Sequence, residues 1–351
     1  MTTSSMDGAR NDEETAQQQV LMMLAGKWVA GILNVVARLG VADLLTGGPR
    51  TTADLAAATE THAPTLYRLL RAAASVGVFA EREDGRFELT PKADYLRSDV
   101  PGTLRYLAYF YGETTVWNSW GSAIDSVRTG EPIGPKLRGG KTWFQYLEQD
   151  VPEFATAFHN AMSELNENRA PKIAASFDFG RFATITDLGG GQGRLLSAIL
   201  QRYPQTRGVL FDIPTAIETA PAVLAAHGVT DRVELVRGSF FESVPSGADA
   251  YLLKAIMHDW PDAECIGVLK RIRAAIDSDK DARVLIIDGV IPEGNEPHYS
   301  KLMDIAMLVT DGGRERTGAE WASLLAHAGF ELAEIHPTTP PHGIVEGRPV
   351  Q

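Results

Sequence analysis

Four glycines close together in the chain form a candidate ligand-binding turn. They occupy positions 189, 190, 191 and 193, after a β-branched run that ends at Asp187 and before an apolar pattern of helical period. Glycine allows positive φ and lets a ligand approach the main chain without a Cβ in the way, and the next helix offers unpaired N–H groups at its start. Strand, turn and helix in this order predict a nucleotide-type site, although close packing alone is the alternative explanation.

The spacing of these glycines argues against a dinucleotide. The dinucleotide fingerprint has a third glycine three residues after the second. Counted from Gly189 and Gly191, that position holds Arg194, and counted from Gly191 and Gly193 it holds Leu196.

An acidic residue ends the second predicted strand. Asp212 lies 21 residues after Gly191, and a carboxylate at that distance can accept hydrogen bonds from both hydroxyls of a ribose. The alternative is that Asp212 caps the helix entered at Pro214. Because the strand end and the spacing agree, the pattern favours ribose.

The bulk properties limit the classes of protein. A chain of 351 residues suggests two domains. Its 33 basic and 45 acidic residues give a net charge of −12, which disfavours nucleic acid and anionic membranes as partners. The single cysteine, Cys265, excludes an internal disulfide and fits a reducing compartment. We expect no leader peptide and no apolar run that spans a membrane, so the sequence predicts a cytoplasmic protein.

From about residue 181 the chain alternates between strand and helix patterns. This alternation predicts an α/β domain with a mostly parallel, Rossmann-like sheet, helices on both faces, and ligands at the carboxyl ends of the strands. The expected elements are 183–188, 194–203, 208–213, 215–227, 232–237, 249–254, 262–277, 283–290, 298–310 and 318–328, with short strands near 331–335 and 343–346.

The N-terminal part of the chain is expected to be helical. Residues 1–14 are small and polar and predict a disordered tail. A wide apolar stripe follows from Leu21 to Leu39, including Leu24 and Trp28. Such a stripe is either buried within its own chain or packed on a partner chain, and its terminal position favours a homodimer.

Residues 52–90 carry a winged-helix pattern. Two short helical segments precede a hairpin that turns at Asp84 and Gly85. A DNA-binding role would need a basic face, yet residues 50–99 contain seven basic and eight acidic side chains. The pattern therefore favours a scaffold or dimerisation surface. The expected division is a tail at 1–14, a helical winged-helix dimerisation domain at 15–100, a helical linker region at 101–180 that contributes to a substrate pocket, and an α/β domain at 181–351.

Several motifs together resemble a known enzyme family. They are Asp187-Leu-Gly-Gly-Gly-Gln-Gly193, the acid at position 212, Lys254 four residues before His258-Asp-Trp, and Gly312-Gly-Arg-Glu-Arg-Thr317. In this combination the chain resembles, over essentially its whole length, the S-adenosylmethionine-dependent small-molecule O-methyltransferases of the plant caffeate type and their bacterial natural-product relatives.

The resemblance implies a cofactor site and a substrate pocket. The cofactor would be S-adenosylmethionine, bound by Ser163, Gly189, Gly191, Asp212, Ser239, Phe240 and Lys254. The pocket for a small aromatic acceptor would include Phe158, Met162, Met257, Met303 and Met307. Two positions depart from the family: Ser239 stands where an acid is usual, and Asp288 stands where plant relatives often carry Glu.

By the same resemblance His258 is the general base. A phenol with a pKa near 10 needs a base, and histidine suits that role. A carboxylate on its other nitrogen would fix the tautomer, and the candidates are Asp288 and Glu315, the latter just before a capping box at Thr317-x-x-Glu320. Asp259 is expected to cap the helix after Pro261. The other histidines lack the HxH and HExxH spacings, so no metal is expected.

Three functions remain open from the sequence. A methyltransferase acting on an aromatic hydroxyl is favoured. The second is a ligand-responsive winged-helix DNA regulator, and the third keeps the fold and cofactor but has lost methyl transfer.

Overall fold

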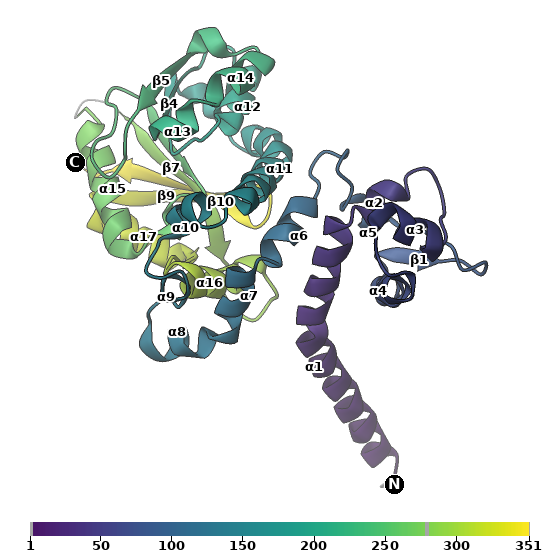
Figure 1. Ribbon diagram of the computed structural model, residues 1–351. Coiled ribbons are helices and arrows are strands. Elements are labelled where there is room, and N and C mark those ends of the chain that lie inside the picture. Colours follow the sequence, from purple (N-terminus) through teal and green to yellow (C-terminus); the bar gives the residue numbers. More distant parts are fainter. Residues whose placement is uncertain (1–2, 278–280, 351) are drawn as a thin grey trace. The chain divides into compact units, whose positions relative to one another are not determined.

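The computed structural model of the chain describes residues 3–277 and 281–350 (Figure 1). The backbone forms two compact units. The first runs to Trp117 and also includes Val151–Leu165, and the second comprises Asn118–Asp150 and the chain from Asn166 onward. The region 101–180 is therefore divided between both units rather than forming one segment. The other domain boundaries stay predictions.

The first unit contains the winged-helix pattern. Helices α3 (Thr52–Thr59) and α4 (Ala63–Ser75) precede the antiparallel strands β1 (Phe79–Glu81) and β2 (Phe87–Leu89), and Gly85 has a φ of 76° in the turn between them. These elements enclose a core of their own, to which Leu55, Leu70 and Phe87 contribute. The other helices of this unit are α1 (Thr3–Arg38), α2 (Val41–Leu44), α5 (Pro91–Asp94), α6 (Arg105–Tyr111), the first half of α7 (Thr114–Gly121) and the N-terminal part of α11 (Pro152–Ser176).

Helix α1 begins earlier than expected. The small polar residues predict a disordered tail up to residue 14, but the helix starts at Thr3. The stretch 13–19 is Glu-Glu-Thr-Ala-Gln-Gln-Gln, and Glu, Ala and Gln are good helix formers that can continue a helix toward the N-terminus.

The apolar stripe of α1 has two different halves. Near its C-terminal end, Val36 is buried in the core of the first unit, and Ile32 and Leu39 pack against that core. Nearer the N-terminus, Leu24 is 71% and Trp28 is 72% exposed. The expectation that the whole stripe forms a dimer interface therefore needs correction, because the later half packs within its own chain.

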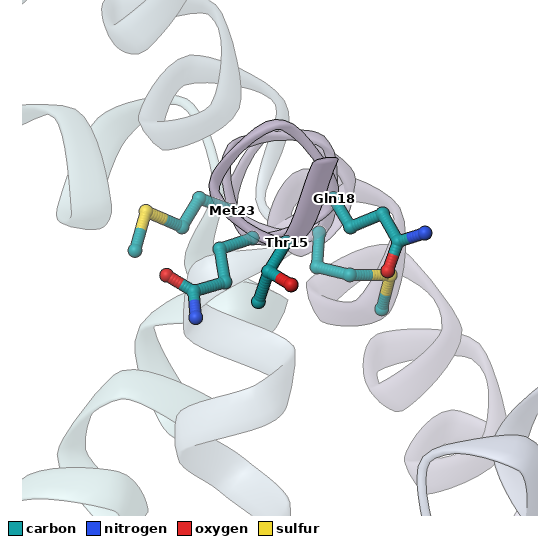
Figure 2. Close-up of a pocket in the computed structure, with 5 residues that line it drawn as sticks. Thr15, Gln18 and Met23 are labelled. Carbon is teal, nitrogen blue, oxygen red and sulfur yellow. The ribbon is translucent and has the colours of Figure 1, made fainter. Parts of the chain in front are cut away.

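A hollow lies beside the exposed half of α1 (Figure 2). Its lining comes from this one helix, which cannot enclose a small ligand. The residues lining the hollow are Thr15, Gln18, Gln19, Met22 and Met23.

By length and composition, Thr15–Arg38 is also apolar enough to cross a membrane. This finding corrects the expectation that the chain has no such run.

The second unit is built on a mixed sheet. Its strand order is β5-β4-β3-β6-β7-β10-β9, and all neighbours are parallel except β10, which is antiparallel to β7 and β9. The chain runs outward from β3 through β4 to β5 and then returns to place β6 on the other side of β3, so ligands are expected where β3 and β6 end. The strands are β3 (Thr184–Leu188), β4 (Arg207–Asp212), β5 (Val233–Arg237), β6 (Ala250–Lys254), β7 (Arg283–Ile291), β8 (Arg316–Thr317), β9 (Phe330–Pro337) and β10 (His342–Pro349).

Helices cover both faces of this sheet. Alternate residues of each strand point to opposite faces; Leu285 and Ile287 of β7 belong to a core with α11 (Pro152–Ser176), α12 (Arg194–Arg202) and α14 (Ala220–Ala226). Val284 and Ile286 belong to a second core with α15 (Asp262–Ala275) and α17 (Gly318–His327). This arrangement confirms the predicted α/β class. The remaining helices are α8 (Ala123–Thr129), α9 (Gly134–Leu137), α10 (Trp143–Gln149), α13 (Pro214–Ile217) and α16 (Tyr299–Thr310), with short 3-10 turns η1 (Phe179–Arg181), η2 (Thr230–Arg232) and η3 (Met257–Asp259).

One helix and two strands differ clearly from their predicted extents. The expected helix 215–227 is divided into α13 and α14, and Pro221 lies in the first turn of α14, where a missing N–H is tolerated, as it would not be inside one long helix. Strands β9 and β10 are longer than predicted because they pair with each other over almost their full length.

Candidate active site

The glycine turn connects β3 to α12 at the strand edge where ligands are expected. Gly189, Gly191 and Gly193 have φ values of 69°, 58° and 79°, which L side chains rarely adopt. A Cβ on Gly191 would meet no heavy atom within 4 Å, whereas one on Gly190 would overlap Asp187. Backbone geometry and the need for packing room therefore both require glycine in this turn.

Asp212 ends β4 beside the turn. The N–H of Gly191 donates to its Oδ2 at 2.8 Å, and the N–H of Ile213 donates to its Oδ1 at 2.7 Å. Burial raises the pKa of this carboxyl, and the two backbone donors lower it in part. A carboxylate has about four acceptor positions, so each oxygen keeps capacity for a further donor. These free acceptor positions fit the two hydroxyl donors of a ribose, and no side chain caps α13.

The other predicted cofactor residues surround the same strand ends. Phe240 lies against the turn, since a Cβ on Gly189 would touch its ring. Ser239 accepts the N–H of Phe241 through its hydroxyl. Lys254 ends β6, next to β3. Burial and Arg169 lower its pKa to about 8, while Asp187 and Asp288 act in the opposite sense.

The predicted pocket residues are distributed over both units. Phe158 and Met162, like the predicted cofactor residue Ser163, belong to the first unit, and Phe158 packs its ring 5.5 Å from that of Phe110. Met257 is fully buried in the core of the second unit. Met303 and Met307 are half-buried on α16. The assignment of these side chains to a pocket stays a prediction.

His258 and Glu315 are in direct contact. His258 lies in η3, directly after β6, and its Nδ1 is 3.0 Å from Oε1 of Glu315. The Glu315 carboxylate lies over Gly289, where any Cβ would overlap it. The N–H of Glu315 donates to Asp304 at 3.0 Å. Of the two carboxylates expected to support His258, Glu315 is the one that contacts the ring, and it lies in the loop before α17.

Asp288 is buried close to this pair. It is fully buried, and neither carboxylate oxygen has a hydrogen-bond partner among the described residues. Burial raises its pKa to about 7, with His258 acting in the opposite sense. Asp288 therefore influences His258 through its charge, whereas Glu315 contacts the ring.

Three carboxylates control the charge of the imidazole. Burial lowers the pKa of His258, but the charges of Asp259, Asp288 and Glu315 exceed this effect and raise the pKa to about 10. Oδ1 of Asp259 is 3.5 Å from Nε2 of His258. The expectation that Asp259 caps the next helix is wrong, because Pro261 holds that position and no side chain caps it. Asp259 is instead a near neighbour of the imidazole.

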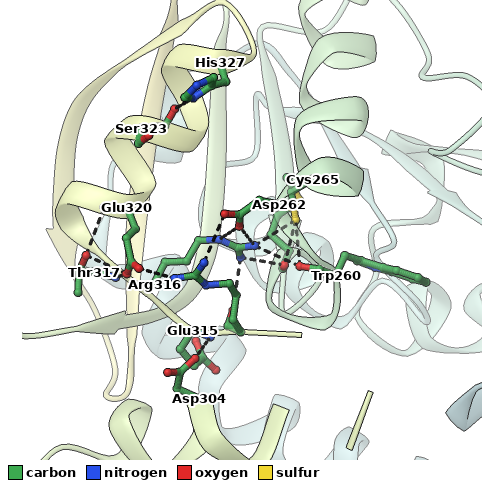
Figure 3. A network of polar contacts seen from close by, with 12 residues as sticks. Trp260, Asp262, Cys265, Asp304, Glu315, Arg316, Thr317, Glu320, Ser323 and His327 are labelled. Atoms are coloured by element: carbon green, nitrogen blue, oxygen red, sulfur yellow. Dashed lines mark hydrogen bonds and ion pairs between the residues drawn. The ribbon is translucent and has the colours of Figure 1, made fainter. Parts of the chain in front are cut away.

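A buried arginine that is not among the predicted site residues lies behind the histidine. The side chain of Arg316 is 1% exposed and lies among Asp262, Cys265 and the carbonyl of Trp260 (Figure 3). The motif Gly312–Thr317 had pointed to this loop, but not to this side chain. The predicted capping box of α17 is confirmed, since Thr317 and Glu320 each accept the backbone N–H of the other.

Comparisons with known proteins agree with this arrangement. The O-methyltransferase domain family matches residues 120–331, and the O-methyltransferase dimerisation domain family matches residues 21–99. The phenazine O-methyltransferase PhzM of Lysobacter antibioticus is 40% identical over 331 residues, which are 94% of this chain and 96% of that protein. The 8-amino-8-demethylriboflavin N,N-dimethyltransferase of Streptomyces davaonensis is 41% identical, with 96% of each chain covered.

A solved structure shows what such a fold binds. An O-methyltransferase from neocarzinostatin biosynthesis, in complex with S-adenosylmethionine and 2-hydroxy-5-methyl naphthoic acid, superposes with a TM-score of 0.77. It is 32% identical, with 92% of this chain and 96% of that chain covered. The chain therefore belongs to the S-adenosylmethionine-dependent O-methyltransferase family, and it carries that family's dimerisation domain.

Proposed function

We propose that the protein methylates a hydroxyl group of a small aromatic acceptor, with His258 as the general base. The observation that carries this proposal is the contact between His258 Nδ1 and Glu315 at 3.0 Å, at the strand edge that also presents the glycine turn. The relatives' names support an aromatic acceptor, since they include phenazine, naphthoate and hydroxybenzoate methyltransferases.

The cofactor side of the site uses mostly the main chain. Asp212 would bind the ribose and Phe240 would flank the adenine. The backbone of the turn at Gly189 and Gly191 would lie against the cofactor. S-adenosylmethionine, when bound, supplies a methyl group that is attached to a positively charged sulfur. When the methyl group is transferred, the sulfur is the leaving group and becomes a neutral thioether.

The acceptor side performs the proton transfer. With its Nδ1–H donated to Glu315, a neutral His258 presents Nε2 as the proton acceptor. The O–H bond of the acceptor breaks, the proton moves to Nε2, and the oxygen keeps the electron pair with which it attacks the methyl carbon. Glu315 and Asp259 then flank the imidazolium and stabilise its charge. A general base contributes typically about 10²–10⁴-fold in rate.

The raised pKa of His258 gives this proposal a pH signature. Only the neutral imidazole accepts a proton, and in the free enzyme the pKa is about 10. Since kcat/KM reports the free enzyme, it should keep rising above neutral pH. At those values an ordinary phenol, with a pKa near 10, also ionises, so the pH profile of a His258→Ala variant is needed to separate the two groups.

Methylation of nitrogen is the second candidate. The relative at 41% identity is an N,N-dimethyltransferase by name, and a neutral amine needs no proton removed before it attacks. An acceptor amine would therefore leave the base largely unused during the attack.

We also propose that α1 forms a homodimer interface through its exposed half, around Leu24 and Trp28. The match of the dimerisation family to residues 21–99 supports this, as does the size of the apolar surface that would otherwise remain in water.

A panel of phenols and the matching arylamines tests the chemistry. Each acceptor is incubated with S-adenosylmethionine and enzyme, and mass spectrometry follows the gain of one methyl group. We expect phenols to be methylated, with strong dependence on His258. Methylation confined to the amines, with equal rates for the wild type and His258→Ala, would overturn the proposal.

A further inference from the structure

The segment 313–316 contacts the turn that carries His258 through each of its four residues. A Cβ on Gly313 would overlap the carbonyl of His258, and the N–H of Arg314 donates to that same carbonyl at 2.8 Å. Glu315 contacts the imidazole at 3.0 Å. Arg316 then reaches behind the turn. The segment 313–316 is thus fitted to the histidine through both its backbone and its ring.

The guanidinium of Arg316 donates hydrogen bonds to backbone carbonyls on both sides of His258 in the sequence. Its Nη1 donates to the carbonyl of Met257 at 3.1 Å, and its Nη2 donates to the carbonyl of Trp260 at 3.1 Å. Nε and Nη2 also donate to Oδ1 of Asp262, at 3.0 and 2.7 Å. One rigid group therefore fixes backbone positions on both sides of the histidine, with an aspartate as its counter-ion.

The turn that carries His258 begins with a strained residue. Ala255 directly follows β6 and has a φ of 52°, a left-handed conformation that costs a residue with a Cβ free energy. Such conformations persist where the surrounding structure determines them. The contacts from Arg316 supply a restraint of this kind two and five residues later.

We propose that Arg316 is a positioning residue that holds the His258 turn against Glu315 and so keeps the imidazole in its working orientation. This inference rests on the proposed function only for its effect on rate, because the contact it describes is independent of the reaction. Lysine cannot replace the arginine in this arrangement. Its single ammonium group is a compact point charge, whereas the guanidinium presents five N–H donors in a fixed planar fork.

Arg316→Lys keeps the charge and removes the fork. We expect kcat to fall about 10–100-fold, since a displacement of about 1 Å at a reacting group costs about 10²-fold. KM for S-adenosylmethionine should stay within roughly twofold, because the glycine turn and Asp212 are untouched. Arg232→Lys is the matched control: Arg232 also donates to several carbonyls, among them Leu200 and Thr206, and it touches no part of the His258 turn in the described contacts.

A second measurement follows His258 without catalysis. Its Cε1–H resonance is titrated by NMR in protein with labelled histidine and assigned by its loss in His258→Gln. The groups facing the ring are Asp259, Asp288 and Glu315, and His342 of β10 also interacts with it. In Arg316→Lys the ring should separate from Glu315, so its titration should move to lower pH. In Arg232→Lys the titration should match the wild type.

Gly313→Ala probes the same fit without changing the guanidinium, because its new Cβ pushes against the carbonyl of His258. We expect the same loss of kcat and the same shift of the titration. If Arg316→Lys kept both the kcat and the His258 titration of the wild type, or if Arg232→Lys changed them equally, Arg316 would not position the histidine. If His258→Ala were fully active while Arg316→Lys still moved the titration, the proposed function would fail and the positioning role would stand.

Discussion

The two sides of the candidate site are built in different ways. Around β3 and β4 the site is made of backbone: glycines with positive φ, and a carboxylate held by the N–H groups of Gly191 and Ile213. Around β6 and β7 it is made of side chains, with the half-buried His258 beside the buried carboxyl groups of Glu315 and Asp288. The first side is suited to binding the cofactor, and the second is suited to proton transfer. Changes on the two sides should therefore affect different kinetic constants.

The largest effect is expected on the side-chain half. His258→Ala should lower kcat for a phenol by about 10²–10⁴-fold, the usual contribution of a general base, while calorimetry finds the wild-type affinity for S-adenosylmethionine. His327→Ala is the control, since His327 is exposed on α17 and bonded only to its own helix in the described contacts. An equal loss in both variants would remove the special role of His258.

The backbone half is tested through Asp212. Asp212→Ala should weaken S-adenosylmethionine binding by about 1.5–3 kcal/mol, the range for hydrogen bonds to a charged group, with kcat at saturation changing far less. Asp231→Ala, at an exposed aspartate of η2, should bind like the wild type. Unchanged affinity of the Asp212 variant would exclude this carboxylate from the cofactor site.

Glu315→Gln tests the side-chain half through the pH dependence of the rate. Glu315 raises the pKa of His258, so its removal should lower that pKa and move the rising limb of kcat/KM to lower pH. The orientation of the ring also suffers, and we expect kcat to fall roughly 10–100-fold. Glu331→Gln, on an exposed residue of β9, should leave the pH profile in place. If the rising limb of the kcat/KM profile kept its position or moved to higher pH, Glu315 would not raise the pKa of His258.

The smallest effect on the chemistry is expected from α1. Leu24→Glu places a charge on the exposed apolar half of the helix, and the dimer dissociation constant should rise at least about tenfold, or about 1.4 kcal/mol. Val127→Glu, at a residue of α8 that is 66% exposed, is the matched control. Sedimentation velocity measures both variants, and a wild-type chain that is monomeric at micromolar concentration would exclude the interface.

The same contrast explains what the sequence can predict. The backbone half leaves local signals, because positive φ favours glycine and the spacing from Gly191 to Asp212 follows from one helix and the strand after it. The order of strands and helices is local in the same way, although the division of α13 from α14 at Pro221, the early start of α1 and the short strand β8 were missed.

The side-chain half depends on contacts between distant parts of the chain. Nothing in the spacing of residues 258 and 316 shows that Arg316 reaches the carbonyls around His258, or that Glu315 rather than Asp288 touches the imidazole. The closeness of Asp259 to Nε2 was missed for another reason, since an acid just before Pro261 is also typical of a helix cap.

Two phenols of different acidity test whether His258 removes the proton of the acceptor hydroxyl. The ratio of wild-type to His258→Ala kcat/KM is measured for an ordinary phenol and for a nitrophenol that is already ionised at the assay pH. If His258 is the base, the ratio should be about 10²–10⁴ for the ordinary phenol and near one for the ionised phenol. Equal ratios for both acceptors would show that His258 does not act by removing this proton.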